Sequence, residues 1–286
     1  MKALIDGDIL VYRIGYSTED VPERLAGVRL RDYFNEILES LLVSDYETHI
    51  TSSDKSNYRY ALDPTYKANR TQPKPVHYDY LRDRLTNDPH YQGIVSFGRE
   101  ADDSIGIASS RFASKRDFII VSIDKDLKQI PGWHYDFVKK RKFYVSQSEA
   151  SKFIYRQLLT GDSADNIGGI TGIGDSISDK LLEPCTNVSE FYRVVRHIYS
   201  EVDDVERLIK RGQLLKIQQR ENEPLWQPPE LSDEEKQQGV SHLIKVDWRK
   251  SFERYSKRRE KKLSSMNQSA STSSTQPSSD STCQIG

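Results

Sequence analysis

The feature that most constrains the fold is an alternation of short apolar runs with helical periodicity along the first two-thirds of the chain. Residues 3–5, 94–97 and 118–123 are apolar runs of strand length. Between the first two runs, apolar residues recur at helical spacing and would share one helical face: Leu30, Phe34, Ile37, Leu38, Leu41 and Leu42. Ser146 and Glu149 form the pattern of a capping box before a helix that runs to about Leu159. This alternation predicts a doubly wound, mostly parallel α/β sheet.

The composition indicates a charge-rich globular protein, because 36% of the 286 residues are hydrophobic and 30% are charged. The net charge of −1 does not by itself indicate a nucleic-acid partner. Cys185 and Cys283 are the only cysteines, too few for a disulfide framework or a cysteine zinc site. The early charges do not fit a signal peptide, and no apolar run approaches the roughly 18 residues of a membrane helix. We therefore expect a cytoplasmic protein without a membrane partner.

Acidic residues follow the predicted strands at the point where each strand ends. They are Asp6 and Asp8 after the first run, Glu100, Asp102 and Asp103 after the second, Asp124 and Asp126 after the third, and Asp162 and Asp165 in the loop after the capped helix. The carboxyl ends of parallel strands meet at one edge of a sheet, where open α/β proteins bind their ligands. We therefore expect the acidic groups at these strand ends to converge on one cleft.

Carboxylates that converge repel one another, and some would take up protons at neutral pH unless cations balance them. Hard oxygen ligands without His or Cys point to Mg²⁺ or Mn²⁺. Two such cations about 4 Å apart can hold both the attacking and the leaving oxygen of a phosphodiester displacement. The alternative is that these residues are helix caps and turn formers, roles that Asp favours. That alternative fits any single pair better than it fits all the groups together.

Cations stand beside aromatic rings in two segments, which contain Arg59 and the residues Tyr66, Lys67 and Arg70. Lys67 and Arg70 are three residues apart, so on a helix they would share a face and could grip or steer a phosphate. A neighbouring tyrosine could stack on a base. An ordinary exposed helix is the alternative interpretation of this segment.

Four further segments have a biased composition. Residues 168–174 form a glycine-rich turn, in which backbone N–H groups can approach a phosphate and the next helix start favours an anion. Residues 139–142 (KKRK) form a basic patch. Eight of the fourteen residues from 249 to 262 are basic, which indicates either a solvated helix face or an arm that contacts a nucleic-acid backbone. From about Ser264 the chain is rich in Ser and Thr, and we predict a disordered tail.

Five motifs together resemble the 5′→3′ exonuclease and flap-endonuclease family, most closely the short bacteriophage 5′→3′ exonucleases. They are LIDGDILVYR, SSDKSNYR with DPTYKANR, EADDSIG, SIDKDLKQI and LTGDSADNIGGITGIG, and they cover roughly residues 3–182. The resemblance implies a PIN-like α/β nuclease fold with a helix-hairpin-helix element. It places a nuclease domain over residues 1–160, a helix-hairpin-helix and helical DNA-binding region over 161–262, and the tail over 263–286.

The resemblance also implies roles for individual residues. The implied metal ligands are Asp6, Asp54, Glu100, Asp102, Asp103, Asp124, Asp126, Asp162 and Asp165, and Asp8 is left out because the wider family often has other residues there. The implied catalytic residues are Asp6, Lys67, Arg70, Asp102 and Asp124, in which Lys67 and Arg70 steer the phosphate. The implied DNA contacts are Arg59, Tyr66, Lys67, Arg70, Gly169, Gly172 and Gly174. The three glycines would hold the duplex backbone, with K⁺ as an additional cation.

The function implied by the resemblance is two-metal phosphodiester hydrolysis from 5′ ends of DNA, on 5′ flaps and on RNA primers in RNA–DNA hybrids. Its partners would be DNA, RNA–DNA hybrid and replication proteins, and we expect a monomer in the cytoplasm of the host of a phage. One rival is a haloacid-dehalogenase-type phosphatase, because Asp6-Gly7-Asp8 after a strand also resembles the nucleophile motif of that class. The other rival is a DNA-binding module without catalysis.

Overall fold

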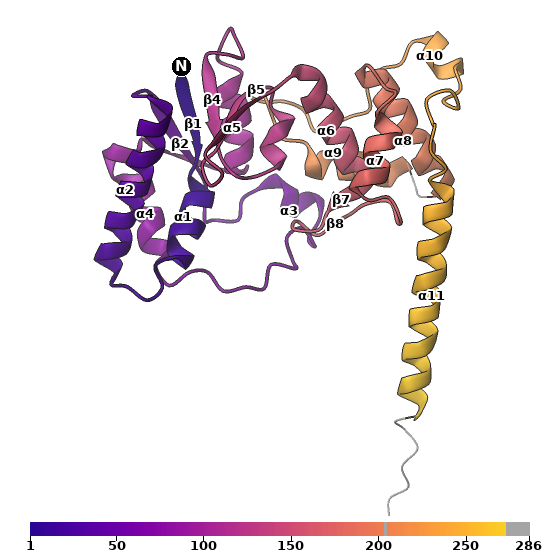
Figure 1. Cartoon of the computed structure of the whole chain (residues 1–286), viewed down its shortest axis with the longest axis horizontal. Coiled ribbons are helices and arrows are strands. Elements are labelled where there is room, and N and C mark those ends of the chain that lie inside the picture. The colour runs from indigo at the N-terminus through magenta and orange to yellow at the C-terminus, as the bar shows by residue number, and fades with distance from the viewer. Residues whose placement is uncertain (203–204, 273–286) are drawn as a thin grey trace, which may run out of the picture.

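A computed structural model of the chain describes residues 1–202 and 205–272. Six strands form the central sheet in the order β3-β2-β1-β4-β5-β6, in which every neighbouring pair is parallel except β5 and β6. These strands are β1 (Lys2–Asp6), β2 (Tyr46–Thr51), β3 (Gly93–Ser96), β4 (Phe118–Val121), β5 (Gly132–Asp136) and β6 (Arg141–Val145). The order reverses between β1 and β4. The prediction of a doubly wound, mostly parallel sheet is therefore confirmed (Figure 1).

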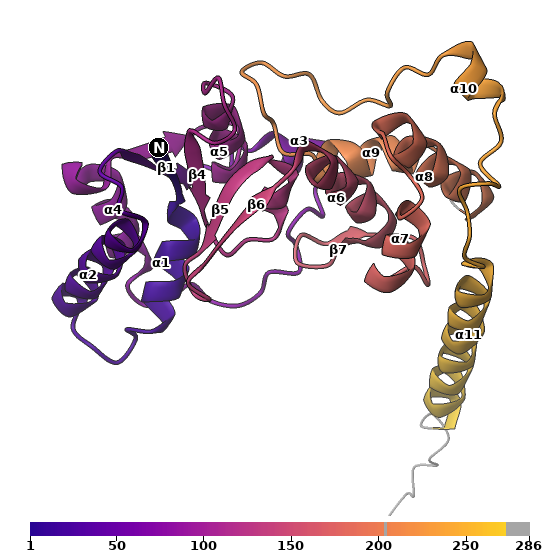
Figure 2. The same ribbon diagram turned by 45° about the horizontal axis from the view of Figure 1, so that its top comes forward.

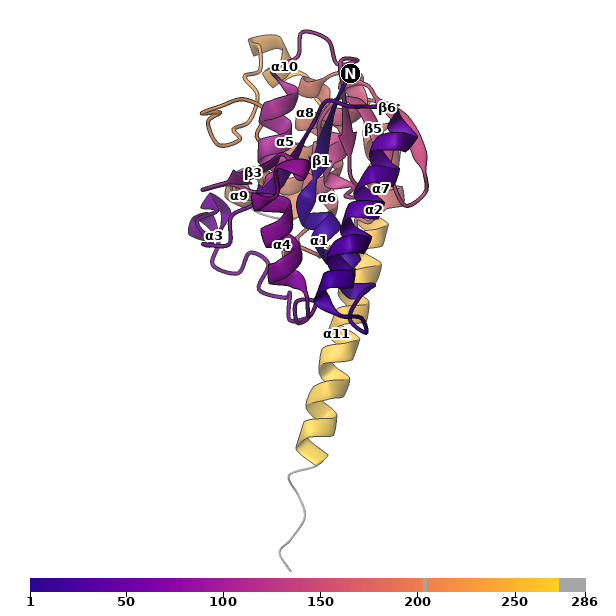
Figure 3. The ribbon, with the colours of Figure 1, turned by 90° about the vertical axis from the view of Figure 1, so that its left-hand side faces the viewer.

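Successive side chains of a strand point to opposite faces of a sheet, and the two faces bury separate hydrophobic cores. Ala3 and Ile5 face a core that they share with the first set of helices: α1 (Gly7–Tyr16), α2 (Glu23–Leu41) and α4 (Tyr78–Asn87). Leu4 faces a second core with Ile105 of α5 (Ala101–Ser109) and with Ile217, which lies just after the helix α9 (Val205–Leu215). The sheet is thus covered on both faces (Figure 3).

A third core holds the helical part of the molecule together. Its helices are α6 (Gln147–Thr160), α7 (Asp175–Leu182), α8 (Val188–Val202) and α9 (Val205–Leu215). The predicted capping box is present at the start of α6, where the Ser146 side chain accepts the Glu149 N–H and the Glu149 carboxylate accepts the Ser146 N–H. Trp248 is fully buried in this core, although it lies far along the chain.

The remaining elements are short, apart from one long helix at the C-terminal side. They are α3 (Tyr58–Leu62), η1 (Pro89–Tyr91), η2 (Asp126–Gln129), the strand pair β7 (Gly161–Asp162) and β8 (Ile167–Gly168), α10 (Asp233–Gln237) and α11 (Arg249–Thr272). Figures 1 and 2 show α11 extending away from the rest of the molecule. No helix in the described part of the chain combines the length and the apolarity that a bilayer crossing requires.

The structure differs from three local predictions. Leu42 is 93% exposed because it lies in the left-handed C-cap that ends α2, rather than on the buried helical face. Phe97 is 67% exposed because β3 is an edge strand and Phe97 lies just beyond it. Residues 264–272, predicted to be disordered, continue α11, since each residue added to an existing helix gains a backbone hydrogen bond. The rest of the predicted disordered tail, residues 273–286, lies outside the described residues.

Candidate active site

The acidic residues that follow β1 and β4 lie at the point where the strand order reverses. In doubly wound sheets this point opens a crevice beside the carboxyl ends of the strands. Asp6 ends β1 and caps α1, where its Oδ1 accepts the Ile9 N–H at 3.2 Å. Its Oδ2 accepts the Ser122 hydroxyl at 2.7 Å, which ties the ends of β1 and β4 together.

Gly7 allows α1 to begin directly at the sheet. A Cβ atom at this position would lie 2.8 Å from the Ile50 side chain and 2.9 Å from the His49 carbonyl oxygen of β2. The close approach positions Asp8 in the first turn of α1, where its carboxylate accepts the Thr51 N–H at 3.1 Å and lies 3.6 Å from the Arg82 guanidinium. Gly7 therefore sets both neighbouring carboxylates at the carboxyl edge of the sheet.

A cleft of about 280 Å³ opens at this edge. Its acidic lining residues are Asp6, Asp8, Glu100, Asp102 and Asp124, and its basic lining residues are Lys55, Lys67, Arg70 and Lys74. Asp102 stands in the first turn of α5 and makes no hydrogen bond within the described residues. All five were expected to converge on one cleft, but Asp8 was left out of the predicted metal ligands. Its signal in the sequence is its spacing of two residues from Asp6, across a glycine.

A second acidic group adjoins Asp124 on the side of the helical part. It consists of Asp126, Asp162 and Asp165. The Gln157 amide of α6 donates to Asp126 at 2.9 Å, and the Ala164 N–H donates to Asp162 at 2.8 Å. The Asp126 N–H donates to Asp124 at 2.8 Å, so the two acidic groups are directly joined.

Three carboxylates of these two groups lack enough nearby positive charge to balance them. Burial and the negative charges of Asp8 and Asp124 raise the pKa of Asp6 to about 7. Burial together with Asp124 and Asp162 raises the pKa of Asp126 to about 8. Burial together with Asp124 and Asp6 raises the pKa of Asp102 well above its ordinary value. Groups with such pKa values gain from any cation that enters the cleft.

The repulsions between neighbouring carboxylates divide them into two sets, and Asp124 belongs to both. Asp6 and Asp102 interact with each other and with Asp124, whereas Asp126 and Asp162 interact with Asp124 from the other side. The donors are all oxygen atoms, the chemistry that hard divalent cations prefer. Among the described residues, no three carboxylates or imidazoles already surround a single point as a complete set of ligands. The chemistry of the donors fits hard divalent cations that complete their coordination with water and substrate.

Lys67 and Arg70 reach the acidic residues from a turn. Residues 64–69 form turns, and Lys67 has a left-handed backbone with φ of 56°, so the prediction that these cations share a helical face is wrong. They nevertheless meet, because the Lys67 ammonium bonds to Glu100 and lies 3.8 Å from Asp165, and Arg70 donates to Asp165 at 2.6 Å. Burial opposes ionisation of Glu100, but the charges of Lys67 and Arg59 outweigh it and lower the pKa of Glu100.

Tyr66 and Arg59 are buried, which corrects their prediction as DNA contacts. The Tyr66 hydroxyl lies 3.0 Å from Glu100 and 2.9 Å from Asp165, so it holds carboxylates in place and its ring cannot stack on a base. Arg59 donates to both oxygens of Asp103, at 2.6 and 2.9 Å, and to the carbonyl oxygens of Leu214 and Lys216. Its guanidinium is therefore fully occupied inside the protein.

The prediction of Asp103 as a metal ligand is also corrected by the structure. Its side chain is fully buried, and besides Arg59 it accepts the Gln218 N–H at 2.9 Å and the Glu100 N–H at 3.1 Å. Each oxygen thus already has two donors within the protein. Asp103 therefore orients Glu100 and cannot itself serve the cleft. A buried carboxylate with this set of donors is a positioning residue for the start of α5.

Asp54 lies outside the residues that line the cleft. Its exposed carboxylate accepts the Ser56 N–H at 2.9 Å within the loop after β2, a local turn that Asp commonly forms. The structure therefore does not bring this predicted ligand to the other carboxylates, and Asp8 occupies the cleft instead.

The three hairpin glycines have different surroundings. A Cβ atom on Gly169 would lie 2.1 Å from the Thr160 carbonyl carbon, so only glycine permits the close packing of β7 and β8 against the end of α6. Gly172 has φ of +83° and faces the backbone of Phe252 in α11. Gly174 is exposed at the start of α7 with open space beside it. Of the three, Gly174 has the backbone that is most open to a ligand.

Comparison with known proteins places the chain in a family. A sequence model described as "5'-3' exonuclease, N-terminal resolvase-like domain" matches residues 1–155. The exonuclease of Escherichia phage T7 is 33% identical over 46% of this chain and 46% of its own length. The flap endonuclease Xni of Shewanella frigidimarina is 31% identical over 66% of this chain and 79% of its own. The chain spans about half the length of the phage T7 relative.

The solved structures agree on the fold. A flap endonuclease of bacteriophage T5, crystallised with DNA and metal ions, superimposes with a TM-score of 0.57 at 16% identity and covers 73% of this chain and 86% of its own. This likeness bears out the predicted PIN-like fold. Because the family model covers more than half of the 286 residues and the motifs resemble the same family, the chain belongs to the 5′-3′ exonuclease family through its N-terminal resolvase-like domain.

Proposed function

We propose that the chain is a metal-dependent 5′ nuclease that hydrolyses phosphodiester bonds of DNA and of RNA–DNA hybrids, at 5′ ends and at 5′ flaps. The observation that carries the proposal is the convergence of carboxylates short of positive charge on one cleft, beside Lys67 and Arg70. The relatives support it, because they are named exonucleases and flap endonucleases. We further propose that it acts as a monomer with replication proteins, in the cytoplasm of the host of a phage.

The proposed cofactor is a pair of Mg²⁺ or Mn²⁺ ions. The first would be held by Asp6, Asp8, Glu100, Asp102 and Asp124, and the second by Asp124, Asp126, Asp162 and Asp165. Bound ions of this kind activate water and stabilise the negative charge that develops on the attacking and leaving oxygens. The crystallisation of the T5 flap endonuclease with metal ions is in keeping with this assignment.

The residues of the chain have three tasks in this proposal. Lys67 and Arg70 draw the scissile phosphate toward a cleft that otherwise repels it. Tyr66 and Asp103 hold Glu100 and Asp165 in place while water forms a new bond to phosphorus and an ester P–O bond breaks. The open backbone at Gly174 and the basic face of α11 hold the duplex phosphates, with K⁺ as the proposed additional cation near the hairpin.

The first test measures metal dependence. Cleavage of an end-labelled 5′ flap, a nicked duplex and an RNA-primed hybrid should require Mg²⁺ or Mn²⁺, and EDTA should abolish it because the cleft carboxylates alone supply no electrophile. Fluorescence anisotropy in EDTA should show that DNA binding largely persists.

Three results would contradict the proposal in distinguishable ways. Undiminished cleavage in EDTA would exclude the metal mechanism. Binding without cleavage in either metal would favour the inactive DNA-binding module. Acid-labile phosphate on Asp6 during turnover would favour the phosphatase of the haloacid-dehalogenase type.

The second test addresses Lys67. Its replacement with Ala should slow single-turnover cleavage at saturating enzyme by roughly 10- to 1000-fold, the usual cost of losing one positioned donor that stabilises charge. Arg70→Ala should act in the same direction. Lys236→Ala, on the distant helix α10, is the matched control and should leave the rate unchanged. A normal single-turnover rate for Lys67→Ala would reduce Lys67 to a surface contact, since saturation removes the binding contribution.

A further inference from the structure

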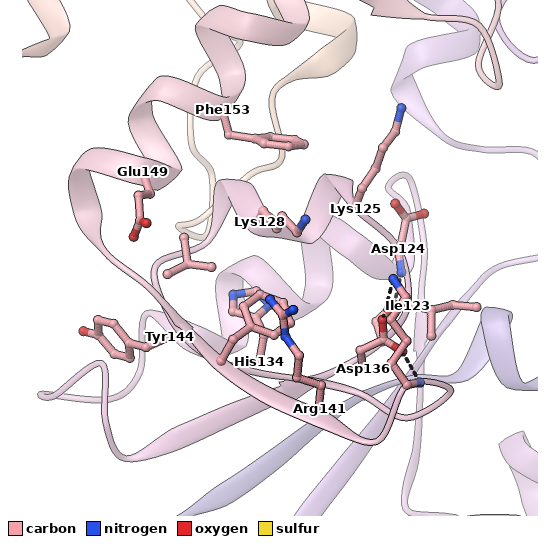
Figure 4. Close-up of a pocket in the computed structure, with 14 residues that line it drawn as sticks. Ile123, Asp124, Lys125, Lys128, His134, Asp136, Arg141, Tyr144, Glu149 and Phe153 are labelled. Carbon is pink, nitrogen blue, oxygen red and sulfur yellow. Dashed lines mark hydrogen bonds and ion pairs between the residues drawn. The ribbon is translucent and has the colours of Figure 1, made fainter. Parts of the chain in front are cut away.

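A second cavity, of about 440 Å³, lies beyond Asp124 on the far side of β4 from Asp6, between the β5–β6 hairpin and α6 (Figure 4). Asp124 lines both this cavity and the acidic cleft, so the two adjoin at this residue. The cavity is within the size range of small-molecule sites in proteins. Nothing in the proposed hydrolysis uses its other side chains, which are mainly cationic and aromatic.

Some of the charged side chains that line this cavity have a partner of opposite charge within the protein, and others have none within the described residues. Asp136 accepts the N–H groups of Val138 and Lys139 and pairs with the Lys139 ammonium at 3.4 Å. Glu149 is held in the capping box at the start of α6, and Lys125 pairs with Asp162 at 3.4 Å. These groups are therefore already satisfied within the protein.

Lys128 and Arg141 are the exceptions. Within the described residues neither makes an ion pair or a side-chain hydrogen bond. Their charged groups lie 5.9 and 5.5 Å from the centre of the same ring, that of Phe143. The Phe143 ring is in turn stacked on the buried His134, at 5.3 Å and 16°. Burial lowers the pKa of His134 to about 4, so this imidazole is neutral and adds no positive charge. Two cations thus lie beside one aromatic ring without an acidic partner among the described residues, an arrangement that can accept an anion.

Phe153 supplies an apolar surface on the opposite wall. It projects from α6, is half-buried, and belongs to none of the three hydrophobic cores. It also makes no ring contact with another aromatic residue in the described part of the chain. Figure 4 shows Phe153 on the α6 side of the cavity and Arg141 with His134 on the hairpin side, with Lys128 between them. A flat ring that faces unpaired cations across a cavity suits a ligand with one aromatic and one anionic end.

We propose that this cavity binds a single nucleotide, with its phosphate at Lys128 and Arg141 and its base on the ring of Phe153. The inference rests on the proposed function, because a nucleic-acid strand in the acidic cleft is what would bring a nucleotide to the adjoining cavity. The nucleotide has two sources with the same chemistry: the unit just released by cleavage, or an unpaired unit of the strand that is still intact.

The test is the binding of deoxyadenosine 5′-monophosphate to the full-length chain in EDTA, measured by calorimetry, so that no cleavage is needed. Phe153→Ala should weaken binding roughly 5- to 150-fold, the range for loss of one base–aromatic stack. Lys128→Ala with Arg141→Ala should weaken it at least about tenfold, since hydrogen bonds to charged groups are lost. Lys142→Ala is the matched control, because Lys142 lies in the same strand, contacts Trp133, and does not line the cavity.

The expected result is weaker binding in both cavity variants and unchanged binding in Lys142→Ala. Deoxyadenosine and inorganic phosphate should each bind more weakly than the nucleotide. The inference is overturned by absence of nucleotide binding, by equal binding of phosphate alone, or by equal losses in the control. Circular dichroism of each variant verifies that the fold is intact. Nucleotide binding without flap cleavage would reject the proposed function alone, and cleavage without nucleotide binding would reject this inference alone.

Two kinetic measurements separate the sources of the nucleotide. If the cavity receives the released unit, added nucleotide inhibits cleavage and the Phe153→Ala variant relieves that inhibition. If the cavity receives a unit of the intact strand, Phe153→Ala raises the KM for a single-stranded flap and leaves kcat unchanged. A variant that changes neither inhibition nor KM would contradict a role of the cavity in either form.

Discussion

Replacing Asp102 with Ala should lower the turnover of 5′-flap cleavage by about a thousandfold or more. Asp102 makes no hydrogen bond within the described residues, so its removal does not disturb the fold, and its carboxylate is free to serve a cation in the cleft. The loss of a group that holds a catalytic cation removes several kcal/mol of transition-state stabilisation, and each 1.4 kcal/mol is about tenfold in rate. Asp124→Asn should have a similar effect, because Asp124 belongs to both acidic sets.

The measurement is single-turnover cleavage alongside anisotropy of the same labelled flap. Binding should weaken little and can tighten, since the variant repels phosphate less. Asp117→Ala is the matched control: this exposed aspartate precedes β4, at the opposite end of the strand from Asp124, and its loss should leave the rate unchanged. Near-normal turnover in both Asp102→Ala and Asp124→Asn would show that the site lies elsewhere.

Asp103→Asn should destabilise the chain by about 3–5 kcal/mol, because breaking a buried ion pair leaves an uncompensated charge. Here the stranded charge is Arg59, which is buried between α3, α5 and the end of α9. Burial opposes ionisation of Asp103, but Arg59 outweighs it and lowers the pKa of Asp103. The stabilisation is therefore present above the ordinary pKa of Asp, about 3.9, and is lost as the pH falls toward the lowered value.

Urea unfolding followed by circular dichroism measures this change as a shift in the midpoint. The double variant Arg59→Met with Asp103→Leu should recover much of the loss, since an apolar pair of similar volume replaces the ion pair. The control is Arg31→Ala, which removes an exposed ion pair with Asp88 and should cost no more than about 1 kcal/mol. An Asp103→Asn variant as stable as this control would contradict the buried-pair assignment.

The sheet and most of the cleft could be predicted because both depend on local patterns. The buried run of residues 118–121 and the capping box at Ser146 are read directly from side-chain periodicity and spacing. The position of Asp6 and Asp124 follows from one topological rule about strand ends. The same rule places Asp8 at this edge, in the first turn of α1, and only the comparison with the wider family removed it from the predicted ligands.

The features of the site that the sequence did not predict depend on contacts between segments that are distant in the chain, and no local pattern contains such contacts. Arg59 and Tyr66 resemble exposed nucleic-acid contacts in sequence. Only their burial against α5, the turn between β7 and β8, and the end of α9 makes them internal supports. Lys67 reaches Glu100 through a left-handed backbone that its residue type does not favour. The β5–β6 hairpin was not predicted because basic residues interrupt the alternation of apolar and polar side chains that is typical of strands. Lys139 and Lys140 lie in its turn, and Arg141 and Lys142 begin β6.

The long-range support of Asp103 has a consequence during synthesis of the chain. Asp103 and the backbone N–H of Gln218 are 115 residues apart, and Arg59 and the carbonyl of Leu214 are 155 apart. Translation at about 5–20 residues per second separates such partners by on the order of ten seconds. A nascent chain that already carries every cleft carboxylate up to Asp165 can form the Arg59–Asp103 pair between α3 and α5. It still lacks the carbonyls of Leu214 and Lys216 and the N–H of Gln218, which complete the hydrogen bonds of that pair. We therefore expect the support of Asp103 to be complete only after Gln218, just beyond the end of α9, has left the ribosome.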